Sequence, residues 1–214
     1  MEIVRDQRDR DRFLDLLYFL NEDFKSDFWE REVLDLPRFT RPDHWPERRQ
    51  LTDILCWTLL PNHLHLLLQV RDDNEKGVPL LMQKLFRSMT GHFNEKYTEI
   101  GSIFQGPYKS KTIDSDSYLR YVIPYVMVKN TFELHPMGFE YAASHFEEAW
   151  KWARTYPYSS LANYLGETVS PILSPENIVH QMFRTENELK SVSHDMLIAH
   201  HQRHAGFREL QLED

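Results

Sequence analysis

The chain has 214 residues, of which 41% are hydrophobic, 13% aromatic and 27% charged. These values are typical of a folded globular protein and exclude general disorder, and the length predicts one compact domain with a C-terminal extension. The formal net charge of −8 does not favour nucleic-acid binding, because nucleic-acid-binding proteins usually carry a basic surface. The middle third is nevertheless rich in basic residues, which leaves room for a local basic groove: Lys84, Arg87, Lys96, Lys109, Lys111, Arg120 and Lys129.

Three features of the sequence bear on the compartment. The one cysteine, Cys56, lies in an apolar run, so no intramolecular disulfide can form, and a reducing cytoplasm is the simplest setting. Residues 1–12 are highly charged and lack the apolar core of a signal peptide. No apolar stretch approaches the ~20 residues that span a bilayer. We therefore expect a cytoplasmic protein with no membrane partner.

The first part of the chain predicts a helix, an irregular segment and a β-hairpin, in that order. Apolar residues recur at helical spacing over 9–24, and three prolines interrupt the mixed segment 27–49. Residues 51–60 and 64–70 are rich in Ile, Leu, Trp, Thr and Val, which favours two antiparallel strands. Pro61 and Asn62 between them are typical turn residues.

The rest of the chain returns mainly to helical patterns. Helical spacing runs over 79–97, and a strand with a bend is predicted over 103–113. Residues 114–117 offer N-cap oxygens for a helix that reaches to about residue 132. Further helices are predicted over 146–156 and 175–201. The last of these contains His200, His201 and His204, which have helical metal-binding spacing.

The sharpest local pattern is a pair of histidines at the start of the second predicted strand. His63 and His65 are two residues apart, so on a strand their side chains point to the same face. Two imidazoles on one face can supply two ligands to a divalent ion. Taken alone, however, this pattern more often has a structural role.

Four segments together resemble the single-tyrosine HUH transposase family, close to the REP-associated tyrosine transposases. The first is the Pro-Asn-His-Leu-His block at 61–65, which is the most specific. The others are Gly-Ser-Ile-Phe-Gln at 101–105 with its trailing basic residues, the tyrosine-rich helix at 117–130, and Tyr-Pro-Tyr-Ser-Ser-Leu at 156–161. The resemblance covers about residues 1–165, and 166–214 is interpreted as a C-terminal helical extension.

The resemblance implies a fold and an activity. The fold is α+β, a ferredoxin-like antiparallel sheet with helices mainly on one face. Family members begin with a strand ahead of the segment that residues 2–6 resemble, so we expect the first strand of the sheet to be missing. The implied activity is cleavage and rejoining of single-stranded, hairpin-associated DNA through a 5′-phosphotyrosine, with Mg²⁺ or Mn²⁺ as cofactor. The protein would then associate with the nucleoid when bound to DNA. A homodimer is one oligomeric state compatible with the resemblance.

The resemblance also implies roles for individual residues. Tyr125 takes the position of the nucleophile, with Tyr121 and Tyr118 as alternatives one and two helical turns earlier. His63 and His65 are implied as metal ligands. The family often places an amide ligand one turn after the tyrosine, where this chain has Lys129, and the amide follows as Asn130. We expect Pro124 to distort the helix enough to bring Asn130 round. The expected DNA-binding residues are Lys109, Lys111, Arg120 and Gln105.

Two other functions stay open at this point. One is a non-catalytic descendant that binds DNA hairpins and has lost its chemistry. The other is an unrelated metal-binding or structural α+β protein in which the histidines stabilise the fold.

Overall fold

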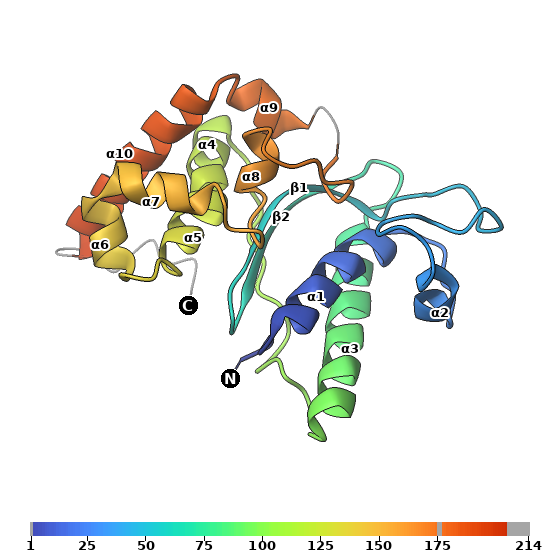
Figure 1. Ribbon diagram of the computed structural model, residues 1–214. Coiled ribbons are helices and arrows are strands. Elements are labelled where there is room, and N and C mark those ends of the chain that lie inside the picture. Colours follow the sequence, from blue (N-terminus) through green and yellow to red (C-terminus); the bar gives the residue numbers. More distant parts are fainter. Residues whose placement is uncertain (1, 175–176, 205–214) are drawn as a thin grey trace.

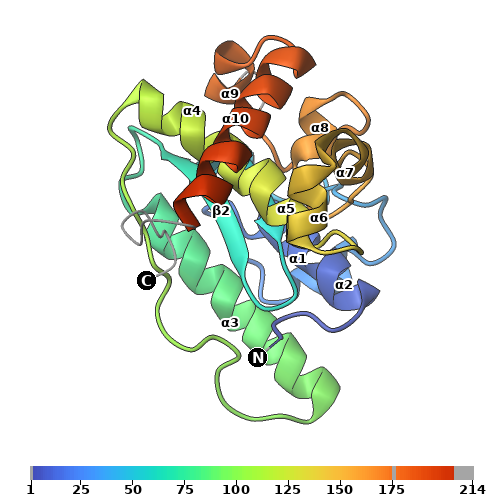
Figure 2. The same cartoon turned by 90° about the vertical axis from the view of Figure 1, so that its left-hand side faces the viewer.

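The computed structural model describes residues 2–174 and 177–204, and shows a mixed α+β fold built around a two-stranded antiparallel sheet. Strand β1 (Thr52–Leu59) pairs with β2 (Leu64–Val70), and one face of the pair carries α1 (Gln7–Phe19) and α3 (Gly77–Tyr97). Helices later in the chain cover the other face (Figure 1 and Figure 2). The two predicted strands and the helix over 79–97 are therefore confirmed.

The hairpin forms where local sequence favours it. Thr58 pairs with His65 and Leu59 with Leu64, and the register is interrupted by a bulge between Ile54 and Cys56. The main-chain N–H of Leu60 donates to the carbonyl oxygen of His63 at 2.9 Å, which closes the turn over the two residues between them. The turn thus places His63 at the entry of β2 and His65 inside it.

The remaining helices pack mostly on the second face. Their bounds are α2 (Trp29–Val33), α4 (Asp116–Pro124), the π-helical turn η1 (Tyr125–Lys129), α5 (Asn130–Phe132), α6 (Phe139–Ser144), α7 (Phe146–Ala153), α8 (Leu161–Tyr164), α9 (Ile178–Met182) and α10 (Glu186–His204). Only α2 lies beside α1 and α3 (Figure 1). The C-terminal α10 contributes Leu189, Met196 and Leu197 to the same apolar cluster as η1 and α7. The side chains of His200, His201 and His204 lie outside the described residues.

The expectation of helices mainly on one face is wrong. Ile54 and Trp57 of β1 pack toward α1 and α3, while Leu55 and Cys56 pack toward α4 and η1. Seven of the eight residues of β1 are buried, which is the pattern of a strand covered on both faces. The apolar residues of β1 do not alternate with polar ones, and such a strand needs a helical layer on each of its two faces.

The expectation of a third strand over 103–113 is also wrong. This segment has no regular secondary structure, and side chains hold it instead: Ile103 is buried, and the Phe104 ring stacks on Phe86 at 3.8 Å between centroids. A strand needs a hydrogen-bonded neighbour, but a pocket separates the segment from the nearest edge of β2. Pro107, which lacks an N–H donor, further weakens any ladder here.

No helix among the described residues is both long and apolar enough to cross a membrane.

Candidate functional site

The two histidines of the hairpin lie side by side. The ring centroids of His63 and His65 are 4.9 Å apart with planes at 83°. The Nδ1 atom of His63 is 2.7 Å from the side-chain oxygen of Asn62. Because a carbonyl oxygen only accepts, this bond assigns the ring proton of His63 to Nδ1, and Nε2 is then the nitrogen suited to bind a metal.

Tyr125 stands at the junction of α4 and η1, on the layer that covers the face of His65. Helix α4 begins at an N-cap formed by Ser115, whose hydroxyl accepts from the N–H of Tyr118. The Tyr125 ring meets the His65 ring edge to face, with centroids 5.9 Å apart and planes at 87°. The Tyr121 ring lies 6.3 Å from that of Tyr125. Tyr125 is itself buried, with 4% of its surface exposed.

The helix changes pitch directly after Pro124. Proline has no N–H to donate and its ring crowds the preceding turn, which is a common cause of local distortion. The next turn is π-helical, and its closing bond runs from the N–H of Asn130 to the carbonyl oxygen of Tyr125, five residues back. Lys129 and Asn130 therefore both lie about one turn after Tyr125. Turns of this kind are frequent at functional sites.

Two hydroxyl groups anchor the π-helical turn to the sheet. The Thr58 hydroxyl donates to the carbonyl oxygen of Val126 at 2.7 Å, and the Ser159 hydroxyl donates to that of Met127 at 3.1 Å. A π-helical turn disturbs the regular main-chain pairing, and these bonds give its carbonyl groups partners. Neither hydroxyl stands out in the sequence, although Ser159 belongs to one of the four segments that carry the resemblance.

The donors around this junction suit a divalent ion in kind. Among the described residues, no group of three or more His, Cys, Asp and Glu side chains is arranged so that it could hold a metal ion, so two imidazoles would need another type of ligand. Asn130 is fully buried, and neither atom of its amide has a hydrogen-bond partner among the described residues. A buried amide without partners costs about 1–3 kcal/mol, which is tolerated most readily where the group serves a ligand. Imidazole and amide oxygen together are compatible with Mn²⁺ or Mg²⁺.

A pocket of about 370 Å³ opens beside the same junction. Four consecutive residues of β2, 64–67, line it, so its wall is the strand edge rather than one face. Lys109, Ser110, Lys111 and Ile113 also line it, while α4 adds Tyr118 and η1 adds Tyr125. Lys109 and Lys111 are exposed at its rim, and the Lys111 ammonium lies 4.7 Å from the centre of the Tyr118 ring. The pocket thus combines cations, aromatic rings and an open strand edge.

The other two expected DNA-binding residues lie elsewhere. Arg120 donates to the carbonyl oxygen of Met182 at 3.0 Å and stacks over the Phe183 ring at 4.8 Å, so its side chain ties α4 to α9. Gln105 is exposed but does not line the pocket. The structure therefore brings together Lys109 and Lys111 from this set.

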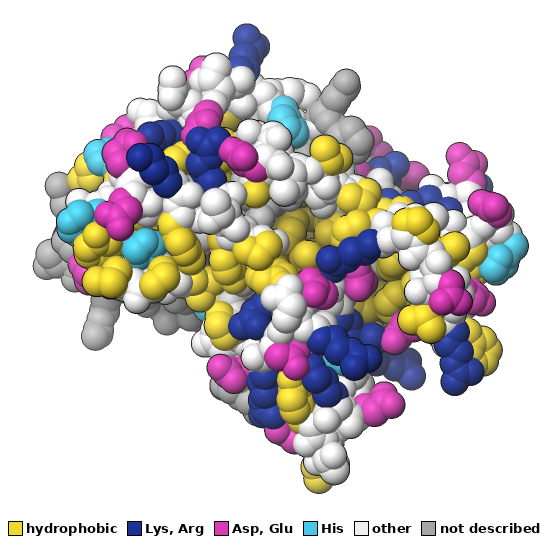
Figure 3. Space-filling view, viewed as in Figure 1, with side chains coloured by type: hydrophobic (Ala, Val, Ile, Leu, Met, Phe, Trp, Pro, Cys, Tyr) yellow, Lys and Arg dark blue, Asp and Glu magenta, His cyan; other side chains and the backbone are white. Residues whose placement is uncertain are grey.

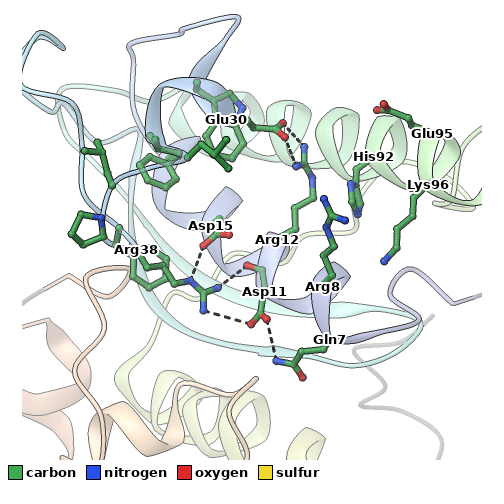
Figure 4. Close-up of a pocket in the computed structure, with 17 residues that line it drawn as sticks. Gln7, Arg8, Asp11, Arg12, Asp15, Glu30, Arg38, His92, Glu95 and Lys96 are labelled. Carbon is green, nitrogen blue, oxygen red and sulfur yellow. Dashed lines mark hydrogen bonds and ion pairs between the residues drawn. The ribbon is translucent and has the colours of Figure 1, made fainter.

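A larger pocket of about 1040 Å³ lies on the opposite face of the sheet, between α1, α3 and the segment that contains α2 (Figure 4). Its charges are largely paired within the chain, since Arg12 binds Glu30 and Arg38 binds Asp15. Figure 3 likewise shows basic and acidic side chains intermixed over one face of the molecule. On this face the charges therefore form no broad basic field that would attract a polyanion.

No protein-family model, curated protein sequence or solved structure matches this chain.

Proposed function

We propose that this protein cleaves and rejoins single-stranded, hairpin-associated DNA, with Tyr125 as the nucleophile and a divalent ion held by His63 and His65. The observation that carries the proposal is the edge-to-face contact of His65 with Tyr125, which unites the histidine pair and the tyrosine at one sheet–helix junction. This is the group of residues to which the sequence resemblance assigns the chemistry.

The residues divide the work in a physically consistent way. A phenol with a pKa near ~10 is a weak nucleophile at neutral pH and needs an environment that favours charge on its oxygen. A bound divalent ion would supply positive charge to the phosphate oxygens, and the buried amide of Asn130, five residues after Tyr125, would be its third protein ligand. The rim lysines Lys109 and Lys111 would contact phosphates of the strand that enters the pocket, and Tyr118 offers a ring on which a base can stack.

A second candidate is a binder of DNA hairpins without catalytic activity. The observation that favours it is Lys129, because a protonated amine cannot ligate a metal and stands where the resemblance expects an amide. In this case the pocket would still hold a DNA strand, but no covalent intermediate would form.

Covalent capture separates these functions. The protein is incubated with labelled hairpin oligonucleotides and Mn²⁺ or Mg²⁺, and the adduct is resolved on a denaturing gel. We expect an adduct with the native protein, none with Tyr125→Phe, and a retained adduct with the matched control Tyr121→Phe. Because Tyr125→Phe removes one oxygen and little volume, the fold should survive.

Three other outcomes would overturn the assignment. An adduct with Tyr125→Phe but not with Tyr121→Phe would move the nucleophile by one helical turn. Hairpin binding without any adduct would favour the non-catalytic binder. No affinity for structured single-stranded DNA would favour an unrelated metal-binding or structural protein.

A further inference from the structure

Lys129 is a buried cation held against the hydroxyl group of Tyr125. Its ammonium nitrogen lies 3.3 Å from the Tyr125 hydroxyl oxygen and 2.7 Å from a carboxylate oxygen of Glu133. The side chain of Lys129 is only 5% exposed. Burying an ammonium group is costly unless it is paired and hydrogen-bonded, so these contacts specify its place. A cation used only as a surface charge would not be buried in this way.

The position of this cation suits charge that develops on the Tyr125 oxygen. A lysine ammonium can only donate hydrogen bonds, and donors interact more strongly with a charged oxygen than with a neutral one. Preorganised donors aimed at a developing oxyanion are among the largest contributions to catalysis. The Glu133 carboxylate keeps Nζ in place through the ion pair, so little reorganisation is needed when charge appears.

We propose that Lys129 is a second catalytic residue, a built-in cation that stabilises charge on the Tyr125 oxygen and weakens the hold of the histidine pair on a divalent ion. The proposal rests on the function proposed above. Lys129 would stabilise part of the negative charge that a metal ion alone would otherwise have to stabilise. It also explains how a lysine is compatible with activity at this position.

The same cation would act in both directions of the reaction. In cleavage, the Tyr125 oxygen bonds to phosphorus and its proton passes to solvent, while the 3′-oxygen leaves with its electron pair and takes a proton from water. In rejoining, a 3′-hydroxyl attacks phosphorus, its proton passes to solvent, and the tyrosine leaves as a phenolate. Lys129 keeps its proton throughout and stabilises the phenolate character of Tyr125 in each step.

The contact itself is tested without any activity, by a double-mutant cycle on unfolding. Denaturant midpoints are measured for Tyr125→Phe, Lys129→Met and the double variant. We expect the double variant to lose clearly less than the sum of the single losses, because both single changes remove one shared interaction. The pair of Tyr118→Phe with Lys129→Met serves as the control and should be additive. If Lys129→Met does not fold, Lys129→Gln takes its place in the cycle. Additive losses for Tyr125 and Lys129 would overturn the inference, whatever the outcome of the capture experiment.

The effect on metal binding is tested with Mn²⁺ in the absence of DNA. The Lys129 ammonium and the His65 ring both lie against the Tyr125 ring, 4.7 and 5.9 Å from its centre. Lys129→Met removes the like charge without adding an oxygen ligand, so we expect Mn²⁺ affinity to rise at least about tenfold. Lys129→Arg keeps the charge and should bind Mn²⁺ as the native protein does. Equal affinity of all three proteins would contradict this part of the inference.

The catalytic effect is tested by single-turnover rates of adduct formation and of rejoining. We expect Lys129→Met to slow both steps by about 100-fold, the usual loss when one preorganised donor is removed, with unchanged oligonucleotide affinity. Lys129→Arg should recover at least about tenfold of that loss, which a merely structural defect would not. Rates within twofold of the native protein for Lys129→Met would refute a catalytic role. Absence of an adduct in the native protein would instead refute the proposed function, and the unfolding cycle would still decide whether the contact exists.

Discussion

His65 on β2 and Tyr125 at the first position of η1 meet edge to face, with ring centroids 5.9 Å apart and ring planes at 87°. The contact joins the sheet to the helical layer at the point where the helix changes from α to π pitch. It also joins the two residue types that the proposed metal-assisted phosphoryl transfer would use, an imidazole as metal ligand and a tyrosine hydroxyl as nucleophile. The first prediction concerns the metal half of this pair.

Divalent metal binding should depend on the two hairpin histidines. We expect native protein to bind Mn²⁺ and the His63→Ala/His65→Ala double variant to lose this binding, because the described residues offer no larger group of acidic and histidine ligands. Isothermal titration measures the binding directly. His44→Ala, which removes an exposed histidine from the segment between α2 and β1, is the control and should bind as the native protein does. Undiminished binding by the double variant would exclude this site.

The close approach of α3 to the start of the sheet should make two glycines of one helix respond in opposite ways. A Cβ added at Gly77 would lie 1.7 Å from the main-chain oxygen of Leu51, whereas one added at Gly91 would meet no atom within 4 Å. Gly77→Ala should therefore destabilise the protein by several kcal/mol. Gly91→Ala, in the helix interior, should stabilise it by about 0.5–1 kcal/mol. Denaturant unfolding measures both, and a stable Gly77→Ala protein would contradict the packing of α3 on Leu51.

Asp9 should give the protein a pH-dependent stability. Its carboxylate is buried on α1 and accepts from the Lys96 ammonium at 2.6 Å, the Arg5 N–H at 2.8 Å and the Tyr97 hydroxyl at 2.7 Å. Burial raises the pKa of Asp9, but these hydrogen bonds and one with His92 outweigh it, so the folded pKa lies below its ordinary value. The stabilisation is thus complete above the unfolded pKa of ~4 and is lost as pH falls below it toward the folded pKa.

Asp9→Asn should remove most of this dependence. We expect it to lower the free energy of unfolding at pH 7 by about 2 kcal/mol, because the Lys96 ammonium, the Arg5 N–H and the Tyr97 hydroxyl lose a charged acceptor, although Lys96 keeps its ion pair with Asp6. The fall in stability between about pH 5 and pH 2 should become shallower than in the native protein. Asp72→Asn, an exposed carboxylate after β2, is the control and should change neither quantity. Unchanged pH dependence in Asp9→Asn would show that other carboxylates dominate the acid unfolding.

The parts of the fold that follow from local sequence were predictable. The strands around Pro61 and Asn62 follow from a dense apolar run interrupted by turn residues, and α3 follows from its helical spacing. The irregular structure of 103–113 was not predictable. Its composition suits a strand, but a strand also needs a neighbour with free hydrogen-bonding groups. Here the edge of β2 borders a pocket instead.

Some residues of the candidate site were likewise expected from the sequence, and others were found only in the structure. The positions of His63, His65 and Tyr125 were expected from motifs, since each motif fixes residue type and spacing. The hydroxyls of Thr58 and Ser159 were not, because a hydroxyl on a strand has many local uses and only the fold shows that both reach η1. Lys129 lies four residues after Tyr125, a spacing that brings two side chains together on a helix, but only the structure shows that its ammonium group meets the Tyr125 hydroxyl.

Under the proposed function, the pocket beside β2 should be where the protein binds single-stranded DNA. Lys109 and Lys111 are exposed at its rim, and each phosphate contact on a single strand contributes about 0.7 to the slope of log affinity against log salt. Lys109→Ala/Lys111→Ala should therefore weaken binding and reduce the slope by about 1.4 if both lysines contact phosphates. Lys25→Ala/Lys151→Ala makes the same change in net charge at exposed positions away from the pocket, and should leave the slope nearly unchanged. Fluorescence anisotropy with a labelled hairpin oligonucleotide at several salt concentrations provides both values. Equal slopes for the two double variants would mean that the strand does not run along this pocket.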